Sequence, residues 1–182
     1  MRFYKKITLK DGRECVLRDC RAADARQALE LFLKTHAETD YMLSYPDENT
    51  FTVAAERDYL AEIGASNDGI ELCAEMDGTM VGTAGISYVG DKYKVSHRAE
   101  FGVGVLKKYW GLGIGRALSE ACIACAKEAG YVQLELEVVA DNLPAVRLYE
   151  SLGFTEFGRN PKGYRSRKNG WQELILMRLE LK

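Results

Sequence analysis

The spacing of apolar and polar residues predicts that the chain opens with β structure followed by two amphipathic helices. After the turn signal Asp11-Gly12, residues 13–18 alternate in polarity and are expected to form a hairpin strand. Apolar side chains then recur at helical spacing over residues 22–36 and again over residues 52–65. The first third of the chain is therefore expected to have the order β-α-α.

The middle of the chain changes to the two-residue period of strands. Residues 71–76 and 79–89 flank Asp77-Gly78, a dipeptide that strongly favours the tight turn of a hairpin. A further strand is expected over residues 98–105. These segments add three successive strands to the predicted sheet.

Helices and strands alternate in the last third. A glycine-rich turn leads into a helix that ends at Gly130, and residues 133–139 alternate in polarity as a strand. A short helix over residues 142–152 and two closing strands over residues 154–159 and 172–181 follow.

The predicted element order is β-α-α-β-β-β-α-β-α-β-β. It indicates an α+β fold, with a single mixed, mostly antiparallel sheet flanked by helices. No repeat, low-complexity tract or proline-rich linker interrupts this order, so residues 1–182 are expected to form a single domain.

Composition and charge narrow the class of protein. Apolar residues make up 47% and charged residues 29% of the 182 positions, which is typical of a globular chain. A net charge of -2 gives no overall positive field for nucleic acid or an anionic membrane, and no apolar run is long enough for a membrane span. We therefore expect a cytoplasmic protein that binds neither.

Five cysteines at irregular spacing indicate reduced thiols. Cys122 and Cys125 form a CxxC, but the surrounding sequence is helical and places both thiols near its apolar face. No second pair of ligands accompanies them. We interpret this pair as core packing and expect no metal site.

The glycine-rich turn has the features of an anion-binding site. Gly111, Gly113 and Gly115 lack Cβ atoms, so the backbone there can approach a ligand closely, and the free N–H groups of the following helix favour a pyrophosphate. A purely conformational need for glycine in a tight connection is the alternative. The spacing matches neither a P-loop nor a dinucleotide-binding fingerprint, so another phosphate-bearing cofactor is indicated.

Two sequence blocks around this turn resemble those of the GNAT acetyltransferases. The first resembles the family's acetyl-CoA loop, usually Q/R-x-x-G-x-G/A, except that Trp110 stands at the glutamine or arginine position. The second resembles the family's N-x-x-A-x-x-L-Y-x-x-x-G-F helix and strand. The first block comprises Val103-Gly104-Val105 and Tyr109-Trp110-Gly111-Leu112-Gly113-Ile114-Gly115-Arg116, and the second runs from Asn142 to Phe154.

The resemblance implies the acyl-CoA N-acyltransferase fold with acetyl-CoA between the strands over residues 98–105 and 133–139. Backbone groups of Val103 and Val105, with Gly104 between them, would pair with the pantetheine arm. Asn142 would hydrogen-bond that arm, although its role as a helix N-cap is an equally good interpretation. The loop that would hold the pyrophosphate consists of Gly111, Leu112, Gly113, Ile114, Gly115 and Arg116.

The resemblance also suggests catalytic residues. Amine acetylation needs a base, because an ammonium has no lone pair, and Glu100 or Glu137 matches positions used in two branches of the family. Glu100 is slightly favoured; the alternative for both is a solvated or paired strand carboxylate. Glu135 lies on the same strand face as Glu137, and two neighbouring carboxylates repel each other. Such a pair is expected to attract a cationic amine or to raise the pKa of one of the two carboxyl groups. Tyr149 matches the usual proton donor to the leaving thiolate, with core packing as its alternative.

The leading hypothesis is transfer of acetyl from acetyl-CoA to a primary amine by direct attack in a ternary complex. A non-catalytic acyl-CoA sensor or interaction module is one alternative, and transfer of another acyl group, or to a hydroxyl or amide, is a second. A small-molecule or peptide amine is expected to bind near the first two helices and Tyr41, Tyr45, Asp47 and Glu48. Residues 159–168 are expected to form a solvated loop, and the apolar strand over residues 172–181 indicates a homodimer.

Overall fold

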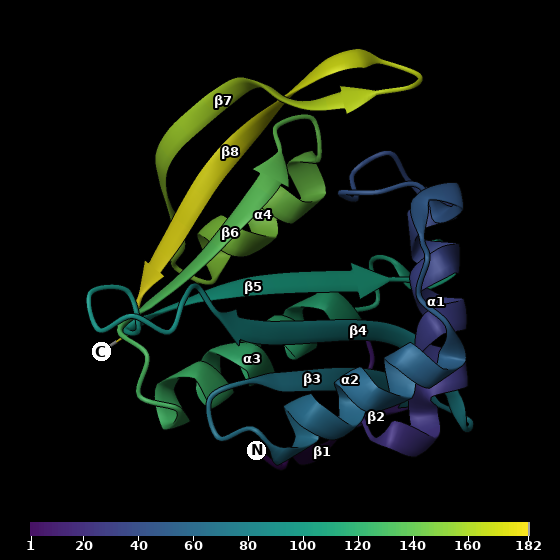
Figure 1. Cartoon of the computed structure of the whole chain (residues 1–182). Coiled ribbons are helices and arrows are strands. Elements are labelled where there is room, and N and C mark those ends of the chain that lie inside the picture. The colour runs from purple at the N-terminus through teal and green to yellow at the C-terminus, as the bar shows by residue number, and fades with distance from the viewer. Residues whose placement is uncertain (182) are drawn as a thin grey trace.

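Eight strands form one mixed sheet in the computed structural model, which describes residues 1–181 (Figure 1). Every neighbouring pair is antiparallel except β5 and β6, and the order across the sheet is β1-β2-β3-β4-β5-β6-β8-β7. The strands are β1 (Tyr4–Thr8), β2 (Glu14–Asp19), β3 (Ile70–Met76), β4 (Thr79–Tyr88), β5 (Arg98–Val105), β6 (Gln133–Val139), β7 (Thr155–Ser166) and β8 (Gly170–Glu180). The predicted α+β class and mixed sheet are confirmed.

Four helices cover the two faces of the sheet. Helix α3 packs on one face against β3, β4 and β5, and α1 and α2 pack on the other. The helices are α1 (Ala25–Glu38), α2 (Val53–Ala65), α3 (Ile114–Glu128) and α4 (Leu143–Ser151), with 3-10 turns at Ala22–Asp24, Pro46–Glu48 and Lys107–Tyr109. Among residues 1–181, none of the helices has the length and hydrophobicity required to span a membrane.

Separate apolar clusters fill the two sides. The larger lies under α3 and α4 and includes Leu118, Leu134 and Met177, while the smaller lies under α1 and α2 and includes Leu31 and Leu60. Cys122 and Cys125 are both buried on the inner face of α3 in the larger cluster. The interpretation of the CxxC as core packing is confirmed.

The N-terminal hairpin contains one strand more than the predicted order. The turn at Asp11-Gly12 joins β1 to β2, whereas the prediction counted only the second of these strands. Most side chains of β1 are exposed, because this strand forms an outer edge of the sheet. An edge strand with both faces exposed to solvent needs no alternation of apolar and polar residues. The sequence pattern therefore did not indicate this strand.

The C-terminal hairpin corrects two expectations. Residues 159–168 do not form a loop, since most of them belong to β7 or to its turn into β8. Pro161 and the irregular register there are tolerated because β7 is an edge strand, where a missing N–H leaves no ladder partner unsatisfied. Strand β8 lies inside the sheet, hydrogen-bonded to β6 and β7, so it has no free edge for pairing with a second subunit.

The parallel pair β5 and β6 positions the site. These strands pair only where Arg98–Glu100 face Gln133–Glu135, and beyond this point they diverge (Figure 1). The rest of β5 and β6 therefore borders an opening within the sheet rather than another strand.

Candidate active site

The diverging half of β5 presents unpaired backbone groups to this opening. Leu106 N–H donates to Val81 and Val89 N–H to the carbonyl of Arg98, so the even-numbered residues of β5 bond to β4. Alternation along a strand then directs the N–H and C=O groups of Val103 and Val105 toward β6. Gly104 bonds to β4 instead, and its contribution to the opening is space.

Strand β6 faces the opening from the other side. Its even-numbered residues bond to β8, as the bonds from Ala140 N–H to Glu173 and from Leu181 N–H to Val132 show. The backbone of Glu137 therefore points toward β5. Two strand edges with free peptide groups suit an extended ligand that carries amides of its own.

A cavity of about 670 Å³ occupies the opening and extends to the glycine-rich loop before α3. Gly111 and Gly113 have φ of +79° and +98°, a region that L side chains rarely adopt, and Gly113 forms the N-cap of α3. The first N–H groups of α3 have no acceptor within the helix. The loop can therefore hold a phosphate, as the sequence predicted.

Not every residue of the predicted loop lines the cavity. Leu112 packs on the main core, and its carbonyl accepts a hydrogen bond from Lys10 N–H. The guanidinium of Arg116 donates to Ser151 Oγ at 2.5 Å, which ties the start of α3 to the end of α4. Lys10 itself lines the cavity beside the loop, a position that no local motif indicated.

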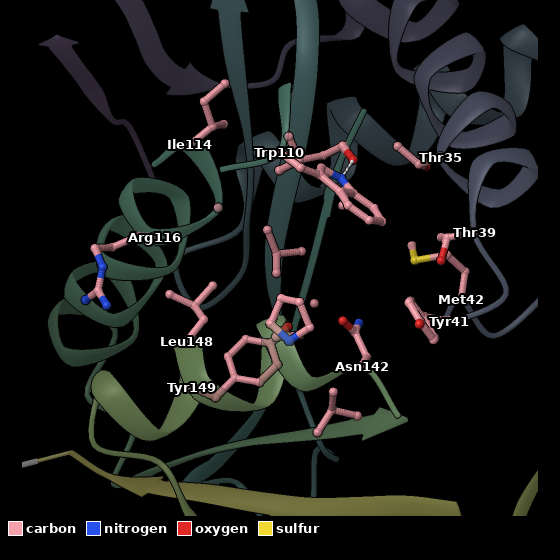
Figure 2. Close-up of a pocket in the computed structure, with 18 of the residues that line it drawn as sticks. Thr35, Thr39, Tyr41, Met42, Trp110, Ile114, Arg116, Asn142, Leu148 and Tyr149 are labelled. Atoms are coloured by element: carbon pink, nitrogen blue, oxygen red, sulfur yellow. Dashed lines mark hydrogen bonds between the residues drawn. The ribbon is translucent and has the colours of Figure 1, made fainter. Parts of the chain in front are cut away.

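Trp110 has a structural role at the mouth of the opening. Its indole Nε1 donates to the Val105 carbonyl at 2.6 Å (Figure 2). The Val105 carbonyl is thus occupied, while its N–H and both peptide groups of Val103 remain directed at β6. The departure from the family pattern fixes the loop to the strand.

Helix α4 brings Tyr149 and Asn142 to the same cavity (Figure 2). Asn142 is the N-cap residue of α4, but its side chain makes no capping hydrogen bond, so its amide is available to a ligand. Tyr149 packs its ring against Phe101 and Phe154, and burial raises the pKa of its hydroxyl to about 12. Both of the interpretations proposed for Tyr149 therefore fit, since the packed ring fixes a hydroxyl that stays protonated at neutral pH.

Comparisons with known proteins decide the family. The model of the acetyltransferase (GNAT) family matches residues 27–154, well over half of the chain. The chain belongs to the GNAT acetyltransferase family. The resemblance seen in the two sequence blocks is thereby confirmed.

Individual relatives agree with this assignment. Ribosomal protein bS18-alanine N-acetyltransferase of Escherichia coli is 38% identical over 81 residues, which cover 44% of this chain and 54% of that protein. The chain therefore spans about half the length of this curated relative. A GNAT acetyltransferase from Streptococcus pneumoniae superposes with a TM-score of 0.87 at 25% identity, covering 91% of this chain and 99% of that one.

A more distant neighbour has the same fold. The yncA protein of Salmonella typhimurium, solved with its cofactor acetyl-CoA, has a TM-score of 0.80 at 23% identity and covers 92% of this chain and 94% of that one. The fold of the GNAT acetyltransferases thus extends over nearly all of the described residues.

The two candidate bases of this GNAT chain face different spaces. Glu137 lines the cavity between β5 and β6, whereas Glu100 lines a second cavity of about 490 Å³ on the side of α1 and α2. The two cavities share lining residues, among them Thr35, Met42 and Val103, so they adjoin one another at β5.

Glu135 corrects an expectation about charge. Arg98 on the neighbouring strand forms a two-pronged ion pair with it, with Nε to Oε1 at 2.6 Å and Nη2 to Oε2 at 2.7 Å. This pairing holds the pKa of Glu135 below its usual value. Glu135 is therefore neutralised by Arg98 and does not act with Glu137 as a repelling pair.

The second cavity contains an acidic residue that the sequence did not single out. Glu71 on β3 lines it, and burial together with the charge of Glu56 raises the pKa of Glu71 to about 8. In the sequence, Glu71 is one of many strand carboxylates, and only the packing of α2 over β3 gives it this environment. A perturbed carboxyl group in a cavity is a marker of a functional site.

The residues expected around the acceptor lie in two places. Tyr41 lines the first cavity, but Tyr45, Asp47 and Glu48 line neither. Arg167, in the turn between β7 and β8, forms ion pairs with Asp47 at 2.8 Å and Glu48 at 3.3 Å, and its backbone N–H donates to the Tyr45 hydroxyl. These three residues hold the loop after α1 against the C-terminal hairpin.

Proposed function

We propose that this chain transfers an acetyl group from acetyl-CoA to a primary amine by direct attack in a ternary complex. The observation that carries the proposal is that the open β5 and β6 edges, the glycine loop and Tyr149 all border one cavity, which adjoins a second. The first cavity has the polar groups that an extended phosphate-bearing ligand needs. The second leaves room for the amine.

In the proposed complex, acetyl-CoA supplies an activated thioester. The chain's part in binding falls to the N–H and C=O groups of Val103, the N–H of Val105 and the backbone of Glu137, which would pair with amides of the pantetheine arm. The loop over residues 111–116 would bind the pyrophosphate through its backbone, with Lys10 adding positive charge and Asn142 adding a side-chain amide.

In the chemical step the nitrogen must lose two protons and the leaving sulfur must gain one. Glu100 is the proposed base, since it lines the cavity assigned to the acceptor and would take the proton that the ammonium must lose before attack. Attack forms the carbon–nitrogen bond and breaks the carbon–sulfur bond. Tyr149 would then donate its hydroxyl proton to the leaving thiolate, and the second proton, lost by the newly acetylated nitrogen, would restore the Tyr149 hydroxyl. Glu137 remains the alternative base.

The first test is a pair of measurements. Calorimetric titration with acetyl-CoA is expected to give one binding site per chain, and free thiol should be released when amines are added. Absence of acetyl-CoA binding would refute the proposal. Binding without turnover on polyamines, aminoglycosides, amino acids and short peptides would favour the alternative of a non-catalytic sensor. Competition by longer acyl-CoA compounds distinguishes transfer of another acyl group.

We also propose a cytoplasmic location and a homodimer. Five free cysteines, all of them buried, fit a reducing compartment. Because β8 is internal, we place the second subunit against the C-terminal edge of the sheet, where Phe157 on the outer strand β7 and Trp171 on β8 leave apolar surface exposed. Light scattering tests the mass in solution, and a monomer at assay concentrations would exclude the dimer.

A further inference from the structure

The second cavity is acidic and its lining contains no lysine or arginine among the described residues. Its titratable side chains are His36, Tyr59, Glu71 and Glu100. Burial lowers the pKa of His36, which keeps the imidazole neutral, and its Nδ1 donates to the Phe32 carbonyl at 2.8 Å. A ligand with positive charge therefore meets no competing cation in this space.

Glu71 lies at the side of the cavity farthest from the cofactor opening. It belongs to β3, and β4 and β5 separate it from the edge that faces β6. Two strand spacings give a span of about 10 Å between β3 and β5. A group bound at Glu71 and a reacting group at the edge of β5 would thus belong to opposite ends of one short molecule.

Glycines keep the path between these ends open. A Cβ on Gly85 of β4 would overlap Glu71 Oε2, so glycine is what allows this carboxyl group to lie across β4. Gly85 faces Gly102 on β5, and Gly104 follows on the same face. The floor from Glu71 to the cofactor opening therefore carries few side chains.

Glu71 has no basic partner. Glu75 is the next acidic residue on this side of β3, and it pairs with Arg18 at 2.8 Å. Neither Glu71 nor Glu56 has an ion pair within residues 1–181. The ring of Phe32 stacks on His36 with centroids 3.7 Å apart, and Tyr59 lines the wall above Glu71. Aromatic faces and a carboxyl group without a cation form a favourable environment for an ammonium.

We propose that Glu71 binds a second ammonium group of the acceptor, so that the preferred acceptor is a diamine or polyamine. This inference rests on the proposed acetyl transfer. An amino acid would bring a carboxylate close to Glu71 and Glu100 with no cation in the lining to neutralise it. Such an acceptor should therefore be a poor substrate.

Three amines with four carbons each test the assignment. Putrescine ends in a second ammonium, butylamine in a methyl group and γ-aminobutyrate in a carboxylate. The ammonium would bind the ionised form of Glu71, so the comparison is made above pH 8, where this carboxyl group has lost its proton. The charge-assisted hydrogen bond then predicts that kcat/KM for putrescine exceeds that for butylamine about ten- to a hundredfold. The value for γ-aminobutyrate should fall below that for butylamine.

Variants locate the effect. In Glu71→Gln, which is similar in shape but uncharged, the ratio of kcat/KM between putrescine and butylamine should drop toward one. Glu62→Gln removes an equal charge from the exposed face of α2 and should keep the wild-type ratio. Glu71→Asp, which keeps the charge on a shorter side chain, should give an intermediate ratio and serves if the glutamine variant does not fold.

The possible outcomes distinguish failure of the proposed role of Glu71 from failure of the proposed acetyl transfer. Equal kcat/KM values for putrescine and butylamine in the wild type, or a ratio unchanged in Glu71→Gln, would overturn the role of Glu71 and leave acetyl transfer standing. Turnover of none of the three amines would overturn the diamine assignment. Lack of acetyl-CoA binding in the same preparation would refute acetyl transfer itself.

Discussion

The two adjoining cavities are built in different ways. The cavity proposed for the cofactor is bordered by backbone edges of β5 and β6, by glycines with positive φ and by a helix N-terminus, and its charged lining residues are Lys10, Arg116, Glu137 and Arg147. The acceptor cavity is formed by side chains from α1, α2, β3, β4 and β5. A cofactor common to many proteins can be bound by backbone that any sequence with the right turns provides. An acceptor that differs between proteins requires side chains, which can change without altering the fold.

The largest expected effect tests whether the cofactor cavity also carries chemistry. Tyr149→Phe should lower kcat about a hundredfold, because a positioned general acid contributes on the order of 10²–10⁴-fold, while acetyl-CoA affinity stays the same. Steady-state kinetics and calorimetry measure the two quantities. Tyr131→Phe is the matched control, since Tyr131 is also buried but lines neither cavity.

A full loss of activity accompanied by weaker acetyl-CoA binding would contradict the donor role of Tyr149. It would mean that the Tyr149 hydroxyl contributes to binding of the cofactor and not to the chemical step.

A second prediction concerns the backbone character of the cofactor cavity. Gly113→Ala forces a Cβ onto φ of +98° and should weaken acetyl-CoA binding about tenfold, equivalent to ~1.4 kcal/mol. Gly130→Ala imposes a similar strain at φ of +84° after the other end of α3. Both variants should lose about 1–2 kcal/mol of unfolding free energy, but only Gly113→Ala should change the affinity. Equal affinity loss in both would indicate general destabilisation.

The acceptor cavity is expected to reduce stability at alkaline pH. The folded pKa of Glu71 is raised from 4.5 to about 8 by burial and by Glu56, so the folded chain retains a proton that the unfolded chain has released between these values. Stability should therefore fall as pH rises through this window.

Because glutamine does not ionise, Glu71→Gln should match the wild type in urea unfolding near pH 5 and exceed it at about pH 9. Glu62→Gln, with an exposed side chain, should follow the wild type at both values. An offset of the same size at both pH values would mean that the substitution acts through packing and that the Glu71 pKa is not shifted.

The smallest expected effect tests Lys10, a charged side chain beside the glycine loop. Lys10→Ala should raise the KM for acetyl-CoA a few-fold at low salt, and the difference should shrink as ionic strength rises and screens the charge. Lys5→Ala, on exposed β1, removes the same charge away from the cavity and should have no effect. A salt-independent effect of Lys10→Ala would mean that the aliphatic part of the side chain acts through packing and not through its charge.

The acceptor site was less predictable than the cofactor site because its parts are far apart in the chain. Glycines, strand and helix start occur within one continuous segment, so their order alone indicated a phosphate-binding loop. Glu71 became recognisable only when α2 packed over β3 and Gly85 of the next strand left room for its carboxyl group. Arg98 likewise reached Glu135 only through parallel pairing of β5 with β6.

The sequence by itself determined the class of fold and the family, and it predicted the loop that we propose for the cofactor. Helical and strand periods, turn dipeptides and two local motifs involve residues that are close together in the chain, so they can be recognised without the tertiary structure. The tertiary structure decided which carboxylates are paired, which face a cavity, and which strands lie at the edges. Burial, charge pairing and strand order depend on contacts between distant segments, and a one-dimensional pattern does not contain them.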